Sequence, residues 1–259
     1  MALKHKYLLY VLLFCTLFCF FGSFSLAVCP DGMVSYWNFD DESVSGSTVE
    51  DVYGNNDGTN HGASLSVGLV GESFNFSGNY VDISSIDMRG FTESSFSFWL
   101  YRTDNSTYNR VYLSSKYDYG EDVRFHVNGE NSQANFDDTS FNAAYYSTPF
   151  LEWAHVVITQ SNADSEVCAY VNGQLSECVS DNFNYGGLDG VTALGKRIHP
   201  VSARYYNGRM DEVAIFNRSL SASEVAQLYN QSSQGYDYCG IYKNTLPLST
   251  KFTEFESTT

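Results

Sequence analysis

Short runs of alternating residues, separated by clusters of Gly, Asn, Asp and Ser, fill most of this 259-residue chain. The run at residues 95–101, SFSFWLY, carries apolar side chains on both of its alternating sides, which predicts a strand at least half buried on each face. Long helical periodicity is absent, and short strands joined by turns are typical of an antiparallel sandwich. The pattern predicts an all-β fold of two antiparallel sheets. Candidate strands lie at residues 33–39, 73–76, 80–83, 95–101, 111–116, 123–127, 155–159, 167–171, 191–194 and 208–216.

One short helix is predicted after Ser221. Ser221 and Glu224 have the spacing of a capping box, in which each side chain bonds the other residue's backbone N–H. Val225, Leu228 and Tyr229 then supply an apolar stripe, so we expect a helix of roughly two to three turns.

Residues 1–27 have the order of a secretory signal peptide. Lys4 and Lys6 precede an apolar stretch at 7–21 that is shorter than the ~20 residues needed to span a bilayer. Small residues follow, and we expect cleavage after Ala27. The prediction is a secreted or cell-surface protein with no membrane span after cleavage; an uncleaved N-terminal anchor is the alternative.

The chain is acidic, with 30 Asp and Glu against 14 Lys and Arg and a net charge of −16. Loss of Lys4 and Lys6 with the signal would make it more negative still. A phosphate backbone would be repelled by such a surface, so nucleic acid is not an expected partner.

The cysteines predict two disulfides. Cys15 and Cys19 fall in the predicted signal, and an even number of cysteines remains in the exported part, which favours bridges. The remaining four, which allow three pairings, are Cys29, Cys168, Cys178 and Cys239.

A hairpin around the turn dipeptide Asn172-Gly173 selects among these pairings. A two-residue loop would set Cys168 opposite Glu177, whereas a three-residue loop or an equivalent bulge would set it opposite Cys178, as a disulfide requires. The predicted bridges are therefore Cys168–Cys178 and Cys29–Cys239.

Three blocks in order resemble LamG-like jelly-roll domains of the concanavalin A-like fold. They are residues 34–40 (VSYWNFD) with the turn at 51–59; residues 74–83 (FNFSGNYVDI) with the strand at 96–100; and residues 153–158 (WAHVVI), the hairpin at 171–173 and residues 208–221 (GRMDEVAIFNRSLS). The resemblance implies a two-sheet jelly-roll sandwich with adjoining termini, which a Cys29–Cys239 bridge also requires. We expect one domain at 28–239 and a polar tail or linker at 240–259.

The same resemblance implies a structural calcium ion near the adjoined termini. Asp40 and Asp211 are its candidate ligands, completed by backbone carbonyls because calcium takes 6 to 8 oxygen ligands. The alternative is that both carboxylates are solvated or cap the backbone.

No catalytic residues are predicted. Related glucanases carry E-x-D-x-x-E on the catalytic strand, and this sequence lacks that motif. Adjacent acids such as Asp211 and Glu212 would point to opposite faces of a strand, so they would not flank one glycosidic bond. No nucleophile-elbow sequence accompanies the histidines, and His155, in an apolar strand, is predicted to be structural. We expect a protein that is not an enzyme.

Tyrosines cluster between the predicted strands, where they could stack on sugars or anchor protein contacts. The predicted ligand-binding residues are Tyr117, Tyr119, Tyr145, Tyr146, Tyr205 and Tyr206. Carbohydrate is the leading ligand class. A structural or adhesive surface domain that contacts proteins is the alternative function, and tyrosines that only cover loops and sheet edges are the alternative role.

Overall fold

The computed structural model describes residues 29–83, 86–88, 90–104, 110–114, 124–128, 131–135, 144–180, 192–197 and 204–243. The predicted signal peptide and residues 244–259 of the predicted tail lie outside these ranges, so they remain predictions.

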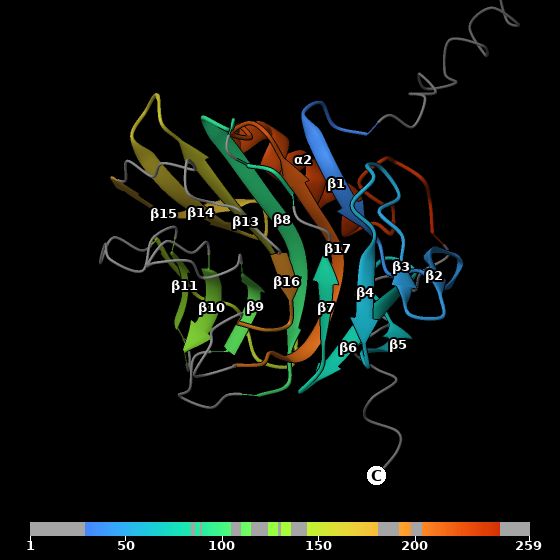
Figure 1. Cartoon of the computed structure of the whole chain (residues 1–259). Coiled ribbons are helices and arrows are strands. Elements are labelled where there is room, and N and C mark those ends of the chain that lie inside the picture. The colour runs from blue at the N-terminus through green and yellow to red at the C-terminus, as the bar shows by residue number, and fades with distance from the viewer. Residues whose placement is uncertain are drawn as a thin grey trace, which may run out of the picture.

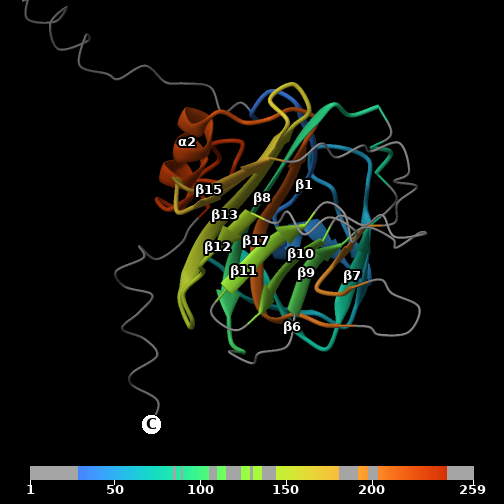
Figure 2. The ribbon, with the colours of Figure 1, turned by 90° about the vertical axis from the view of Figure 1, so that its left-hand side faces the viewer.

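The described strands form two antiparallel sheets stacked face to face, as predicted (Figure 1, Figure 2). Sheet A has the order β15-β14-β13-β8-β17-β6-β5, with β1 also beside β17. Sheet B has the order β12-β11-β10-β9-β16-β7-β4-β3-β2. Each candidate strand is present. Several short strands of the structure were not predicted from the sequence.

The bounds of the elements are as follows. Sheet A contains β1 (Met33–Trp37), β5 (Ser64–Val67), β6 (Glu72–Ser77), β8 (Glu93–Arg102), β13 (Trp153–Ser161), β14 (Glu166–Val171), β15 (Gln174–Ser180) and β17 (Asn207–Phe216). Sheet B contains β2 (Val44–Ser45), β3 (Thr48–Val49), β4 (Gly58–His61), β7 (Tyr80–Ile83), β9 (Arg110–Ser114), β10 (Arg124–Asn128), β11 (Asn131–Asn135), β12 (Ala144–Tyr146) and β16 (Thr192–Leu194). In the described ranges, the helices are η1 (Asp41–Ser43) and α2 (Ala222–Ser232).

The main core fills the space between the sheets. Phe96, Phe98 and Leu100 of β8 face inward, together with Val81 of β7 and Leu194 of β16, and all are at most 2% exposed. Alternation along each strand therefore sends the intervening residues to the outer faces of the two sheets.

The outer face of sheet A is covered by a second core. Trp99 of β8 and Val157 of β13 pack there beneath Val225 and Leu228 of α2, and Figure 2 shows the helix on the side of sheet A away from sheet B. The capping box of Ser221 and Glu224 starts this helix as predicted. Both faces of β8 are thus buried, which the run at residues 95–101 predicted.

The hairpin β14–β15 reaches the predicted cysteine register by a bulge. Asn172 and Gly173 have φ of 51° and 76°, and they form a two-residue turn between the paired Val171 and Gln174. The register then shifts between Ala169 and Tyr170, so that Cys168 lies opposite Cys178. The three-residue loop is therefore wrong and its alternative, the bulge, is correct. The disulfides Cys168–Cys178 and Cys29–Cys239 are both present.

Candidate functional site

The structure separates the predicted ligand-binding tyrosines. Tyr117 and Tyr119 lie outside the described residues, and Tyr145 lies in β12 opposite Gln133. Tyr205 is half-buried and lies opposite Lys196 in an isolated bridge.

Two of these predictions are wrong, because Tyr146 and Tyr206 are core residues. Tyr146 is 3% exposed and Tyr206 is 0% exposed, and both belong to the cluster between the sheets. The ring of Tyr206 packs edge-on against Phe76, with 6.3 Å between centroids. Because neighbouring residues of an extended segment point to opposite sides, the outward position of Tyr205 directs Tyr206 inward.

Tyr205 belongs to a group of side chains on the outer face of sheet B, where β4, β7 and β16 run side by side (Figure 1). We call this group the aromatic patch; its members are His61, Tyr80, Asp82, Lys196 and Tyr205. The patch is built by register: His61 of β4 pairs with Tyr80 of β7, and Thr59 pairs with Asp82. Val81 and Ile83 alternate with the outward residues of β7 and are buried in the main core, so the strand is fixed from below.

The ring of Tyr80 lies at the centre of the patch. The His61 ring stacks on it with 4.4 Å between centroids and 15° between planes, and the Lys196 ammonium lies 3.8 Å from the same centroid. The ring of Tyr80 is therefore already in contact with both an aromatic ring and an ammonium. The Tyr205 ring is tilted by 46°, with its centroid 6.3 Å from that of Tyr80.

Lys196 reaches the patch after a bend at Gly195, directly following β16. Gly195 has φ of 80° and lies against Phe76, whose ring would collide with any Cβ at this position. The Ser114 hydroxyl donates a hydrogen bond to the Lys196 carbonyl at 2.8 Å, and the Tyr206 N–H donates to the Gly195 carbonyl at 2.9 Å. The backbone beneath the Lys196 side chain is therefore fixed by the fold.

Charged groups complete the patch. The Asp82 carboxylate lies 3.0 Å from His61 Nε2, and the side chains of both residues are 39% exposed. The patch thus offers aromatic rings, a carboxylate and an ammonium on one rigid surface, which is chemistry that can stack on a sugar and bond its hydroxyls. Of these residues, only Tyr205 was predicted from the sequence; the register of β4 on β7 brings the others together.

The first predicted calcium ligand, Asp40, is 2% exposed and already has nitrogen donors on both oxygens. Its Oδ1 accepts the Glu72 N–H at 2.9 Å, while Oδ2 accepts the Asn38 amide at 3.0 Å and contacts the Lys243 ammonium at 2.9 Å. Lys243, which lies four residues beyond Cys239, also bonds Glu42 at 2.8 Å. A carboxylate in this state caps the backbone and pairs with a lysine.

The second predicted ligand, Asp211, is 0% exposed on the outer side of sheet A. Its Oδ2 accepts the N–H groups of Leu69 and Val70 at 2.7 and 3.0 Å. The register of β17 on β8 shifts between Asp211 and Ala214, so Glu212 also lies on this outer side, because Met210 and Val213 both enter the main core. The prediction that these adjacent acids point to opposite faces is therefore wrong.

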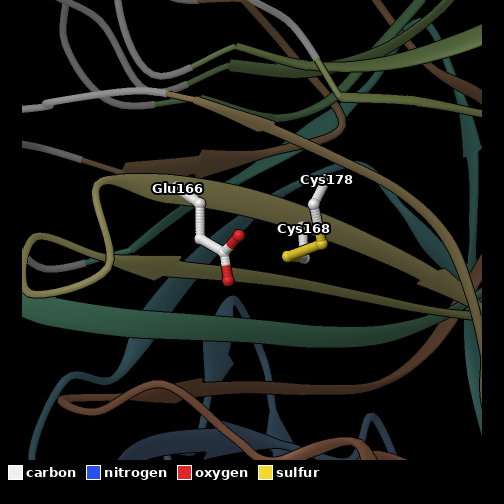
Figure 3. Close-up of side chains that lie close together, drawn as sticks. All are labelled: Glu166, Cys168 and Cys178. Carbon is white, nitrogen blue, oxygen red and sulfur yellow. A yellow bond between two sulfur atoms is a disulfide. The ribbon is translucent and has the colours of Figure 1, made fainter.

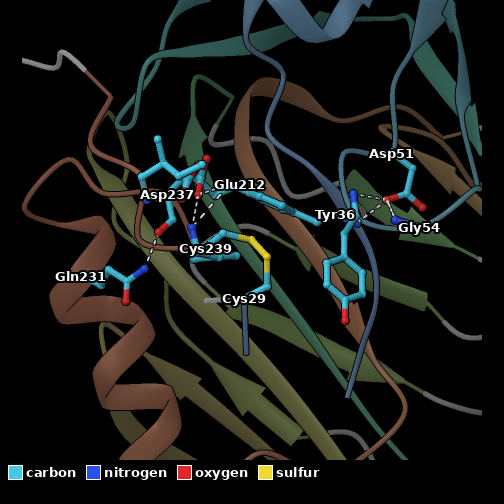
Figure 4. The surroundings of a disulfide bond; sticks show 11 residues. Cys29, Tyr36, Asp51, Gly54, Glu212, Gln231, Asp237 and Cys239 are labelled. Atoms are coloured by element: carbon cyan, nitrogen blue, oxygen red, sulfur yellow. Dashed lines mark hydrogen bonds between the residues drawn. A yellow bond between two sulfur atoms is a disulfide. The ribbon is translucent and has the colours of Figure 1, made fainter. Parts of the chain in front are cut away.

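Glu212 lies beneath the C-terminal segment, close to the Cys29–Cys239 disulfide (Figure 4). Its Oε2 accepts the Tyr36 hydroxyl at 2.6 Å and the Tyr238 N–H at 3.1 Å. Complete burial, with Asp211 beside it, raises the pKa of Glu212 well above its usual value. Being 0% exposed, Glu212 cannot touch a substrate.

These carboxylates do not fit a calcium ion as they stand. The described oxygens of Asp40 and the Oδ2 of Asp211 face N–H and ammonium donors, so an ion would have to displace Lys243 or backbone groups. Among the described residues, one group of three possible metal-binding side chains converges within 4.8 Å: Glu166, Cys168 and Cys178 (Figure 3). Its two sulfurs are bonded to each other, which removes the thiolates that bind metals. Calcium at Asp40 and Asp211 stays a prediction.

His155 has the structural position that was predicted. It is 0% exposed, and its Nε2 lies 2.9 Å from both the Ser97 and the Tyr238 hydroxyls, which bond each other at 2.8 Å. Burial lowers the pKa of His155 to about 3, so the ring is neutral at physiological pH. The group is sealed under α2 and the C-terminal segment, and it links sheet A to both.

A polar pocket of ≈ 440 Å³ opens beside η1 and β3. Its lining includes Glu42, Thr48, Glu50 and Asn55. Asp51, also in the lining, accepts the N–H groups of Tyr36 and Gly54 at 2.8 Å each, which fixes the loop that forms the pocket wall (Figure 4). The acids of this pocket are thus partly used by the fold.

The two stacked antiparallel sheets define a jelly-roll sandwich. The family model described as the concanavalin A-like lectin/glucanases superfamily matches residues 75–226, more than half of the chain. The chain therefore belongs to this superfamily, as its sequence blocks predicted. Among curated proteins, no sequence matches it significantly.

Solved structures share the fold at low identity. Domain 4 of AbnA, a GH43 extracellular arabinanase from Geobacillus stearothermophilus in complex with arabinotriose, superposes with a TM-score of 0.60 and 19% identity, covering 76% of this chain and 98% of that one. Trypanosoma rangeli sialidase in complex with 2,3-difluorosialic acid has a TM-score of 0.58 and 18% identity over 78% of this chain. A botulinum neurotoxin type C structure, concerned with cell entry through two ganglioside molecules, has a TM-score of 0.60 and 14% identity over 78% of this chain. The match spans 33% of the sialidase and 52% of the neurotoxin chain.

The fold is thus shared by enzymes and by binding domains. In the part of the chain that the structure describes, no helix has the length and apolar character needed to cross a membrane.

Proposed function

We propose that this domain is an exported, non-catalytic module that binds carbohydrate through the aromatic patch on the outer face of sheet B. The observation that carries the proposal is the convergence of His61, Tyr80 and Tyr205 with Lys196 and Asp82 on one exposed surface. Sugar rings present apolar C–H faces and a rim of hydroxyls, so a binding surface needs rings for stacking and polar groups at their edges.

Within the patch, Tyr205 supplies the stacking surface. The Tyr80 ring already contacts His61 and Lys196, so it serves as the support. Tyr205 is tilted away from Tyr80 and half-buried, which leaves part of its ring open. Asp82 and Lys196 then bond the hydroxyls of the stacked sugar.

Two other surfaces support the proposal less well. Tyr236 and Tyr242 are 40% and 55% exposed, with ring centroids 5.2 Å apart, but they belong to the C-terminal segment outside both sheets. The pocket beside η1 is polar and acidic, and its described lining contains no aromatic ring. A rigid sheet holds a binding geometry more closely than a loop or a terminal segment does.

The relatives add support at the level of ligand class. The arabinanase domain was solved with arabinotriose, the sialidase with a sialic acid derivative, and the neurotoxin work concerns gangliosides. The non-catalytic role is supported by the adjacent acids of β17. Asp211 and Glu212 are both 0% exposed, so neither can touch a substrate. Two disulfides support export, because such bonds persist in oxidising compartments.

The test is a glycan array probed with the purified protein, its Tyr205→Ala variant and a control, Tyr236→Ala, which also removes an exposed tyrosine. We expect wild type and the control to bind the same glycans, and Tyr205→Ala to lose at least about tenfold in affinity. The melting temperatures of the three proteins should agree within a few degrees, since each substitution is at the surface.

If well-folded wild type binds no glycan on the array, carbohydrate binding is refuted. The structural or adhesive alternative would then stand, and the search would move to protein partners. Equal losses in both variants would refute the patch as the site, even if the protein binds glycans.

A further inference from the structure

Most positive charges of the described residues are committed to the fold. Arg102, Arg197 and Arg209 are at most 8% exposed. Arg218 pairs with Glu224 at 2.6 Å, and Lys243 pairs with Asp40 and Glu42. In a chain with 30 acidic and 14 basic residues, such pairing is the expected use of a cation.

Lys196 departs from this rule although a carboxylate is close by. Within the patch, Asp82 pairs with His61 at 3.0 Å, while the described contact of the Lys196 ammonium is the face of Tyr80 at 3.8 Å. An ammonium has three N–H donors, and contact with one ring leaves donors for another partner. Among the described residues, Lys196 is thus a partly exposed cation on the aromatic patch without a carboxylate partner.

The other described cation near the patch, Arg204, is directed elsewhere. Lys196 lies opposite Tyr205, and the Arg197 N–H bonds the Arg204 carbonyl at 2.8 Å, so the two arginines share the opposite side of this short ladder. Arg197 on that side is 7% exposed. Lys196 is therefore the cation that a ligand stacked on Tyr205 would meet.

We infer that the aromatic patch takes an acidic saccharide, whose anionic group is bound by the Lys196 ammonium while the sugar ring stacks on Tyr205. This inference rests on the proposed function and narrows its ligand class. A neutral sugar would use the rings and Asp82, but it would leave the ammonium without the partner to which it bonds best. Because the protein as a whole is acidic, it repels anions. A cation on the binding surface is what allows an anion to bind there.

The experiment compares saccharides that share a neutral core and differ in charge. The first set is lactose, sialyllactose and sulfated lactose; the second is an oligogalacturonide and its methyl ester, in which the charge is removed and the sugar is kept. Affinities are measured for wild type, Lys196→Met, and a control, Arg218→Met, which removes the same charge beside Glu224 of α2. The glycan array that tests the proposed function carries such pairs of charged and neutral saccharides for other sugar types.

We expect wild type to bind the charged member of at least one pair about tenfold more tightly than the neutral member, and Lys196→Met to lose that preference. Binding should weaken with rising salt in wild type and in Arg218→Met, and less so in Lys196→Met. Preference for sialyllactose and oligogalacturonide identifies the anionic group as carboxylate, and preference for sulfated lactose identifies it as sulfate.

Equal binding of charged and neutral members would overturn the inference while leaving the proposed function intact. A charge preference that persists in Lys196→Met would overturn the role of Lys196. Binding to no glycan at all would overturn the inference together with the proposed function.

Discussion

The outer faces of the two sheets carry similar side chains and differ in what covers them. On sheet A, Trp99, His155 and Tyr36 lie beneath α2 and the C-terminal segment, all at most 1% exposed. On sheet B, the side chains of His61 and its contact Asp82 are 39% exposed. Aromatic rings and histidines occur on both faces, so residue type alone does not distinguish a structural surface from a binding one. The two kinds of surface differ in whether other segments cover them and in whether their polar groups already have partners.

Several polar side chains of the covered face also bond one another. The Trp99 N–H donates to the Ser232 hydroxyl at 2.9 Å, and the His155, Ser97 and Tyr238 side chains bond one another. Buried groups of this kind specify a packing arrangement, because an unmatched partner costs free energy. We therefore expect changes on sheet A to alter stability and changes on sheet B to alter binding.

The largest expected effect is loss of the Cys29–Cys239 disulfide, which holds the cover on sheet A. The double substitution Cys29→Ala and Cys239→Ala opens a link between residues 210 positions apart. In the chain-entropy model this lowers the free energy of unfolding by about 5 kcal/mol. The Cys168→Ala and Cys178→Ala pair, only 10 positions apart, is the control and should lose about 3 kcal/mol. Denaturant unfolding of both variants checks this order, and a reversed order would contradict it.

Next in size is Trp99→Ala. It leaves a cavity beneath α2, removes the stacking on Tyr229 and leaves the Ser232 hydroxyl without this donor. We expect a loss of about 3–5 kcal/mol in the free energy of unfolding. Tyr205→Ala on sheet B should lose less than about 1 kcal/mol. Comparable losses in the two variants would remove the distinction between the faces.

His155 makes the covered face sensitive to acid. Its pKa of about 3 in the fold lies below its ordinary value of 6.5, so between these values the unfolded chain binds one more proton than the folded one. The stability contribution is complete above pH 6.5 and is lost as pH falls toward 3, by about 1.4 kcal/mol per pH unit. Glu212, whose pKa is raised by burial, contributes with the opposite sign to both proteins, so the difference in unfolding free energy between wild type and His155→Gln isolates the slope of His155 across the window.

Glu224 supplies a control with a different window. Hydrogen bonding to Arg218 lowers the pKa of Glu224 from 4.5 to about 2, so its contribution is present above 4.5 and is lost as pH falls toward 2. Glu224→Gln should therefore leave the slope between pH 6.5 and 4.5 unchanged. The same pH dependence of stability in wild type and His155→Gln between pH 6.5 and pH 4.5 would contradict the assignment to His155.

A smaller effect than that of Trp99→Ala is expected at Lys243. Lys243→Met leaves the buried Asp40 without its cation, which should lower the free energy of unfolding by about 1–3 kcal/mol. Because the ammonium supplies positive charge there, we expect a chelator to leave the melting temperature of wild type unchanged. A rise with added calcium and a fall with chelator would instead support the ion that the family resemblance implied.

The sequence predicted the features that depend on local pattern. Alternation placed the strands, Ser221 and Glu224 placed the start of α2, and the Asn172-Gly173 turn placed the hairpin that pairs Cys168 with Cys178. Very short strands such as Val44–Ser45 and Thr48–Val49 are missed because two residues carry no periodicity.

The candidate site was only partly predictable, because it depends on register between distant segments. The pair Tyr205-Tyr206 had to contain one inward and one outward ring, but only the bridge to Lys196 shows which is which. His61, Tyr80 and Lys196 come from separate strands or turns, and nothing local to any of them signals the others. The bulge after Asp211 likewise reversed the expected direction of Glu212.

The most direct test of the account is an NMR titration of the isotope-labelled protein with a glycan taken from the array. The account predicts that the amide signals that shift belong to His61, Tyr80, Lys196, Tyr205 and their neighbours on β4, β7 and β16. Signals of Trp99, His155 and Tyr238 should stay in place. Shifts that gather around the pocket at Glu42 and Glu50, or around Tyr236 and Tyr242, with the β4, β7 and β16 signals unmoved, would contradict it.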